Sequence, residues 1–197
     1  MKRPGWLLRP GLLLVMNIAV LLAVLATLFA FSPRRARGAE GNARWSRADL
    51  PVQVLVAPEA LDHHGAIARA VLILNRAAGA ELFAFPRAVT LVYVKDIMRG
   101  GHLVRGHVLV RADGEFVPAT AHTEPVFSRP GVLYAAVVTL PRERVPDWML
   151  RAAILHEWLH AAGRLAHETD PGCVGYQVLL PAQRLCEATR RWLRGYR

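Results

Sequence analysis

A run of about 21 residues without a charged side chain, residues 11–31, limits most strongly how this chain can fold. At 1.5 Å per residue, a helix of this length spans a hydrocarbon layer of roughly 30 Å. Only Asn17 and Thr27 interrupt the run with polar groups. We therefore expect residues 11–31 to form one transmembrane anchor, preceded by a short basic tail at residues 1–10.

A long secretory signal sequence is the alternative interpretation of this run. Ala36 and Gly38 have the spacing of a small-residue cleavage site. However, the apolar core of a signal sequence normally has about 7–15 residues, and the greater length here favours an uncleaved anchor. Basic residues flank both ends of the run, and the positive-inside rule therefore gives no clear orientation. The short N-terminal tail favours a single-pass protein with its domain outside the cytoplasm, or a secreted domain after cleavage.

The net charge of +10 is concentrated near the expected membrane. Residues 1–50 contain eight basic and two acidic side chains, whereas the longer remainder is only weakly basic. This distribution suits attraction to anionic lipid headgroups. No interleaving of basic and aromatic residues indicates a nucleic-acid surface, and we expect no nucleic-acid partner. Residues 32–50 have no apolar periodicity and are interpreted as a basic linker.

Residues 51–197 have room for one domain, and their patterns alternate between strands and helices. Strands are expected at residues 51–58, 80–85, 88–96 and 132–140. Alternating patterns around Asp113-Gly114 predict a hairpin over residues 102–117, followed by an irregular loop over residues 118–131. Helices are expected at residues 61–79, 147–162 and 181–195, each followed or ended by a glycine.

The stretch HEWLHAAGRLAH, residues 156–167, carries the chemistry. His156 and His160 are four residues apart, and a helix places their imidazoles on one face, where both can bind one zinc ion. Glu157 lies beside them and can take a proton from zinc-bound water as general base. Gly163 follows where the helix is expected to end and the chain to reverse.

The stretch resembles the metzincin zinc peptidases, and within them the matrixin-like branch. The four residues just described match the family motif His-Glu-x-x-His-x-x-Gly. The segment that follows the motif in matrixins is matched at Asp170, Pro171 and Tyr176. The resemblance covers roughly residues 51–176 and is strong only over 156–176. It implies an α+β, zincin-like fold: a mixed, mostly parallel twisted sheet with an active-site helix. It also implies one catalytic Zn²⁺ and a peptide or protein substrate.

Two departures from the family pattern affect the expected site. The third histidine is His167, one residue later than in the pattern, within a loop that loses little by lengthening. Gly175 replaces the methionine that packs beneath the metal in the family. Glu168 and Asp170 are weaker candidates for the third ligand, and a gluzincin-type site would use Glu187 instead.

Other expected features of the site follow from the same resemblance and from the cysteines. Tyr176 is a candidate stabiliser of the transition state. A sheet edge above the zinc would bind substrate by strand addition, and the resemblance suggests a stretch within residues 102–111. In an oxidising compartment Cys173 and Cys186 could form a disulfide worth about 3 kcal/mol. A catalytically inactive, zinc-binding membrane module is the alternative function, although a purely structural site has no use for Glu157.

Overall fold

The computed structural model describes residues 42–99, 102–113, 121–142 and 145–196, which all belong to one compact unit, Ala39–Arg197. The predicted basic tail (1–10), the anchor (11–31) and most of the linker (32–50) lie outside the described residues. Within the described ranges, no helix is long and apolar enough to cross a membrane.

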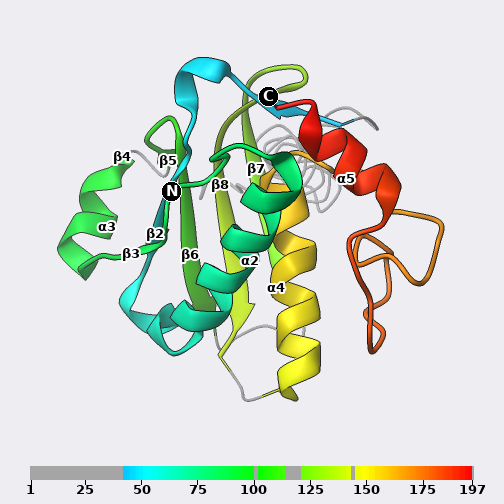
Figure 1. Ribbon diagram of the computed structural model, residues 1–197. Coiled ribbons are helices and arrows are strands. Elements are labelled where there is room, and N and C mark those ends of the chain that lie inside the picture. Colours follow the sequence, from blue (N-terminus) through cyan, green and yellow to red (C-terminus); the bar gives the residue numbers. More distant parts are fainter. Residues whose placement is uncertain (1–41, 100–101, 114–120, 143–144, 197) are drawn as a thin grey trace, which may run out of the picture. The chain divides into compact units, whose positions relative to one another are not determined.

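A six-stranded, mostly parallel sheet forms the centre of this unit (Figure 1). Its strands are β1 (Arg44–Trp45), β2 (Gln53–Val56), β3 (Arg87–Ala88), β6 (His107–Asp113), β7 (His122–Arg129) and β8 (Val132–Pro141). The order β3-β2-β6-β8 is parallel throughout, β1 pairs in parallel with the start of β8, and β7 pairs antiparallel with β8. The expected mixed, mostly parallel sheet is confirmed.

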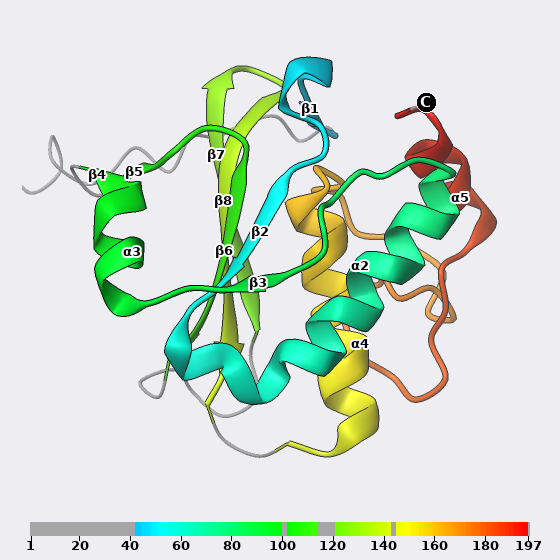
Figure 2. The same ribbon diagram turned by 60° about the vertical axis from the view of Figure 1, so that its left-hand side comes forward.

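Two long helices pack on one face of the sheet, as Figures 1 and 2 show. They are α2 (His64–Ala78) and α4 (Asp147–Ala161), and the C-terminal helix α5 (Glu187–Arg194) packs against α2. The short helix α3 (Leu91–Ile97) lies away from this pair. The remaining elements are two 3₁₀ turns and a small hairpin: η1 (Arg47–Asp49), η2 (Pro58–His63), and β4 (Met98–Arg99) with β5 (His102–Leu103).

The apolar run of β8 is buried because apolar side chains pack against both faces of the strand. Ala136 and Val138 belong to the core shared with α2 and α4, whereas Ala135 and Val137 belong to a second cluster with Ile97 of α3. Alternate side chains of a strand point to opposite faces. The prediction of a strand over residues 132–140 that is apolar on both faces is therefore confirmed.

The end of the expected linker belongs to the domain, and the boundary at residue 51 is wrong. Ala43 is fully buried and Trp45 nearly so. The indole Nε1 of Trp45 donates a hydrogen bond of 2.9 Å to the carbonyl of Ala161, at the end of α4. A two-residue strand is too short to produce a periodic pattern, and the arginine-rich composition around it indicated a linker instead.

Two of the expected strands are also wrong. Residues 80–85 form no extended strand and contribute one isolated bridge, between Phe83 and Val52. In the segment 88–96, only Ala88 lies in β3, and helix α3 begins at Leu91. The hydroxyl of Thr90 caps α3 by accepting a hydrogen bond from the backbone N–H of Tyr93. This local cap and contacts across the second cluster outweigh the strand propensity of valine and tyrosine.

The predicted hairpin over residues 102–117 and the loop over 118–131 are wrong for a linked reason. Strand β6 pairs in parallel with both β2 and β8, and thus lies inside the sheet and not in a hairpin. The antiparallel partner of β8 is β7, within the segment that its prolines had marked as a loop. Pro125 is tolerated there because a strand at a sheet edge needs no donor on its outer side. The expected substrate edge within residues 102–111 is therefore also misplaced.

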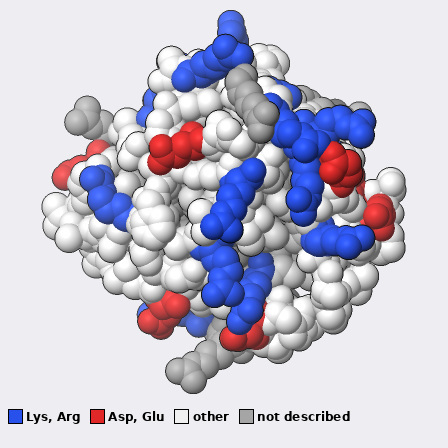
Figure 3. Space-filling model, viewed as in Figure 1, with Lys and Arg blue, Asp and Glu red and all other residues white. Residues whose placement is uncertain are grey.

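Positive side chains dominate the face that α2, α4 and α5 form (Figure 3). Exposed arginines on these helices are Arg69, Arg76, Arg151, Arg190, Arg191 and Arg194. Two of them have acidic partners, since Arg151 pairs with Asp147 and Arg194 with Glu187. Helix α2 contains no acidic residue, and the surface it presents is accordingly positive.

Candidate metal centre

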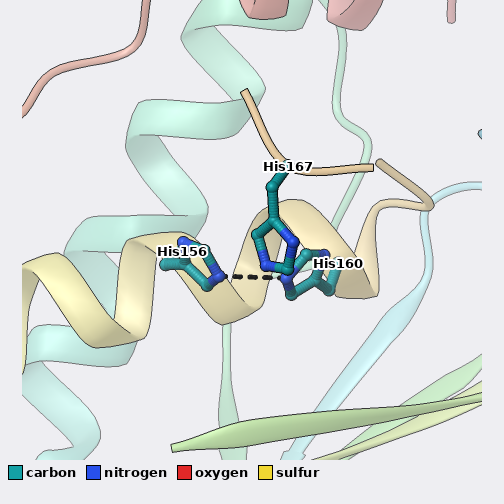
Figure 4. A group of neighbouring side chains, drawn as sticks. All are labelled: His156, His160 and His167. Carbon is teal, nitrogen blue, oxygen red and sulfur yellow. Dashed lines mark hydrogen bonds between the residues drawn. The ribbon is translucent and has the colours of Figure 1, made fainter. Parts of the chain in front are cut away.

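Helix α4 presents His156 and His160 on one face, as the four-residue spacing predicts (Figure 4). Their Nε2 atoms are 3.0 Å apart, and His156 is buried. His167, from the loop after the helix, completes a group of three whose ligand atoms all lie within 4.8 Å of one another. The structure thus brings together the three histidines that the sequence selected.

The hydrogen bonds of the two helical histidines determine which ring nitrogens are free. Nδ1 of His156 lies 2.7 Å from the carbonyl oxygen of Val174, and Nδ1 of His160 lies 2.8 Å from that of Arg164. A carbonyl only accepts, which means that each Nδ1 carries the hydrogen and each neutral ring has its lone pair on Nε2. The backbone therefore orients both Nε2 lone pairs toward one point, in the way that backbone carbonyls orient metal-binding histidines.

Two facing lone pairs at 3.0 Å repel unless a positive charge lies between them. A proton is a poor candidate at neutral pH, because burial first, and then the nearby His156, lower the pKa of His160 to about 4. Burial lowers the pKa of His156 as well. Two nitrogens bound tetrahedrally to one zinc ion lie about 3.3 Å apart, close to the spacing here. The donor set therefore fits a metal ion that prefers neutral imidazole.

Gly163 lets the chain reverse after α4, as expected. Its φ is +99°, and a Cβ built on it would lie 2.4 Å from the carbonyl oxygen of Ala43. The backbone N–H of Ala43 donates a 2.8 Å hydrogen bond to the Gly163 carbonyl. The turn is thus fixed against the β1 segment, which the sequence had not connected with the site.

A network around Glu168 holds the loop that carries His167. The carboxylate accepts hydrogen bonds from the guanidinium of Arg164, at 2.6 and 3.1 Å, and from the hydroxyl of Thr189 on α5, at 2.8 Å. Burial raises the pKa of Glu168, but these bonds outweigh it and lower the pKa below its ordinary value. Glu168 is therefore occupied as an anchor for the loop. The additional residue before His167 is accommodated between Arg164 and this anchor.

The other proposed third ligands have different surroundings. Asp170 Oδ1 accepts a 2.8 Å hydrogen bond from the backbone N–H of Gly172 and closes a turn. Glu187 is exposed at the start of α5 and pairs with Arg194. Neither belongs to the described group of side chains that could hold a metal ion. The geometry therefore favours His167 over the gluzincin-type arrangement.

Val174 and Gly175 form the floor beneath the histidines, where the family pattern has methionine. Val174 is buried, and its carbonyl holds the ring of His156. A Cβ on Gly175 would lie 3.0 Å from Cγ of Glu168 and 3.6 Å from Cδ1 of Leu159. The stem of Glu168 and the side chain of Leu159 thus occupy the space around Gly175. The backbone of Glu168 also donates a 2.8 Å hydrogen bond to the Gly175 carbonyl.

Glu157 is buried on α4 and turns toward the edge strand β7. Its Oε2 accepts a 2.7 Å hydrogen bond from the hydroxyl of Thr123. Burial raises the pKa of Glu157, and the bond from Thr123 only partly offsets this effect. A carboxylate with a raised pKa takes up a proton more readily than one in water, which is what a general base requires. Thr123 and Val174 were not identified from the sequence, because neither residue type marks a site.

The remaining predicted residues lie in the segment after the histidines. Tyr176 is partly buried, and its backbone pairs with that of Glu168; its catalytic role stays a prediction. Cys173 and Cys186 are both free thiols and lie close enough to hydrogen-bond with each other. Burial, and then the bond with Cys186, raise the pKa of Cys173 to about 12. The predicted disulfide therefore has its two partners side by side.

Comparison with known proteins adds no assignment to this geometry. No protein-family model matches the sequence, and no curated protein is significantly similar to it.

Proposed function

We propose that this chain is a membrane-anchored zinc endopeptidase of metzincin type, with Glu157 as its general base. The observation that carries this proposal is the group of three histidines with a buried carboxylate on the same helix. Protein sites with three ligands and one open position are typical of catalytic zinc, whereas structural zinc sites are closed by four protein ligands.

The residues fit zinc and the hydrolysis of a peptide bond. The ion would be held by His156, His160 and His167. When bound, zinc acts as a Lewis acid and lowers the pKa of a bound water to about 7. Glu157 accepts the proton that this water loses and then gives it to the nitrogen of the leaving amine. Burial of Glu157 supports this role, because a desolvated carboxylate holds a proton more readily than one in water.

The proposed substrate is an extended peptide segment that pairs with β7. This strand lies next to α4 and, among the described strands, pairs only with β8, so that its other side could receive a further strand. Under this proposal, the site recognises the backbone of the substrate more than its side chains. The apolar run at residues 11–31 would keep the enzyme at a membrane, and the positive face of α2 suits an anionic lipid surface.

Metal analysis combined with one substitution tests the proposal. The purified chain should contain about one zinc ion and should cleave unfolded protein substrates. Glu157→Gln should retain zinc and lose cleavage by at least about 100-fold, because general-base catalysis contributes about 10²–10⁴-fold. Glu81→Gln is the matched control, since Glu81 is exposed and should be dispensable.

Other results of the metal analysis and of the cleavage assay would contradict different parts of the proposal. A chain without zinc would refute the metal site. Bound zinc without any cleavage would identify an inactive zinc-binding module instead of a peptidase. Unchanged cleavage by Glu157→Gln would remove Glu157 from the mechanism while leaving the zinc site in place.

A further inference from the structure

Thr123 connects the edge strand with the carboxylate of Glu157. Its Oγ1 lies 2.7 Å from Glu157 Oε2 and 3.0 Å from the Glu157 carbonyl oxygen. In the pairing with β8, Thr123 is opposite Val138, whose side chain points into the core shared with α4. Thr123 is therefore on the face of β7 that looks toward the active-site helix.

The hydroxyl of a threonine has a single hydrogen, which limits what Thr123 can do. It can donate to the carboxylate or to the carbonyl of Glu157, or be shared less favourably between the two. Hydrogen bonds to an ionised oxygen are shorter and stronger than those to a neutral one. The 2.7 Å contact with Oε2 is the shorter of the two, and the ionised carboxylate is therefore the preferred acceptor.

Occupation of Oε2 leaves the other carboxylate oxygen for chemistry. Among the described hydrogen bonds, the one that a side chain makes to the Glu157 carboxylate reaches Oε2 and comes from Thr123. The general base must present one oxygen to water in a fixed direction, and the bond from Thr123 fixes the torsion that sets this direction. A carboxylate without that bond would rotate about its terminal torsion, which has a broad range of allowed angles.

We infer that Thr123 is a positioning residue, which couples the strand that would receive the substrate to the orientation of the general base. This inference rests on the proposed function, because it gives a role to Thr123 only if Glu157 acts as base. Thr123 itself touches neither the metal ligands nor the reacting atoms in this account. Its effect passes through Glu157.

The variants Thr123→Val and Thr123→Ser test the inference in the zinc-loaded full chain. Valine keeps the shape of threonine and removes the hydroxyl, whereas serine keeps the hydroxyl and removes a methyl group. We expect Thr123→Val to lower kcat about 10- to 100-fold with KM changed less than about twofold, because small misplacement of a catalytic group costs up to about 100-fold. Thr123→Ser should recover kcat to within about threefold of the original chain.

Thr139→Val is the matched control. Thr139 is buried on β8, and its hydroxyl accepts a 3.1 Å hydrogen bond from Arg111. It lies one residue along β8 from the partner of Thr123, and its side chain therefore points to the opposite face of the sheet. This control removes a buried threonine hydroxyl from the same sheet without touching Glu157, and kcat should remain close to that of the original chain.

Crystal structures of the zinc-loaded original chain and of Thr123→Val provide a measurement that does not depend on activity. The Glu157 carboxylate should turn away from its original direction in the variant, with zinc content unchanged. An unmoved carboxylate, a Thr123→Val enzyme with full kcat, or a Thr123→Ser enzyme as impaired as Thr123→Val would each overturn the inference. Failure of the original chain to cleave any substrate would instead refute the proposed function, and with it the catalytic role given to Thr123.

Discussion

Replacement of Gly163 by alanine should show how strongly the turn after α4 depends on its contact with the start of the domain. Gly163 has a φ of +99°, where residues with a Cβ are disfavoured by about 1–2 kcal/mol. A Cβ would also lie 2.4 Å from the carbonyl oxygen of Ala43 and 3.1 Å from Cδ1 of Leu133. The first of these distances is too short for any real contact, and Ala43 must therefore move.

Movement of Ala43 has a cost that can be worked from its bonds. Its N–H donates a 2.8 Å hydrogen bond to the Gly163 carbonyl, and loss of such a bond costs about 0.5–1.5 kcal/mol net. Displacement of β1 also loosens the buried indole of Trp45 from the end of α4. We expect Gly163→Ala to lower the free energy of unfolding by about 2–4 kcal/mol in total.

Gly131→Ala separates the two contributions. Gly131 also has a positive φ, +74°, but a Cβ there would meet nothing within 4 Å. This variant should therefore lose only the conformational part, about 1–2 kcal/mol. Urea denaturation of the metal-free chains, followed by tryptophan fluorescence, measures both losses. Equal losses in the two variants would refute the argument that close approach to Ala43 makes Gly163 necessary.

His167→Ala should weaken zinc binding by at least about 10-fold in a competition titration with a chelator, and Glu187→Ala should leave it unchanged; the opposite order would support a gluzincin-type site. The pKa of His160 is lowered from 6.5 to about 4, first by burial, so the unfolded metal-free chain binds more protons between these values. The free energy of unfolding of the metal-free chain should therefore fall by roughly 3 kcal/mol as the pH is lowered from about 6.5 to 4. The variant His160→Gln should lack that part of the pH dependence. Oxidation should join Cys173 and Cys186, with loss of both thiols in a titration and a gain of about 3 kcal/mol in the free energy of unfolding; retention of free thiols under oxidising conditions would contradict this prediction.

Local patterns predicted the helices better than the strands. The period of apolar residues and the glycine at residue 79 located α2, and Asp147 with Gly163 bounded α4 to within two residues. A helix satisfies its own backbone hydrogen bonds, and its signal is therefore contained in the segment itself. The segment 88–96 failed because the same residue types suit either a strand or a short helix against an apolar cluster.

The strand partners required information that lies far apart in the sequence. The prolines of β7 predict a loop, although a proline at a sheet edge does not interrupt pairing. The local pattern predicts β6 as half of a hairpin, yet its partners β2 and β8 come from distant parts of the chain. Parallel partners are joined by long crossovers, and no local turn signal can announce them.

The sequence alone identifies His156, His160 and Glu157 as candidate site residues, because all three lie on one helix and helical geometry brings them together. How these side chains are held depends on contacts made by the folded chain. The groups that hold them all lie outside helix α4. They are the carbonyls that orient the imidazoles, the carboxylate of Glu168 and the hydroxyl of Thr123. Their places depend on long-range packing, which no spacing within one segment encodes. The loop that carries the late His167 is held at both ends, by the turn at Gly163 and by the hydrogen bonds of Glu168.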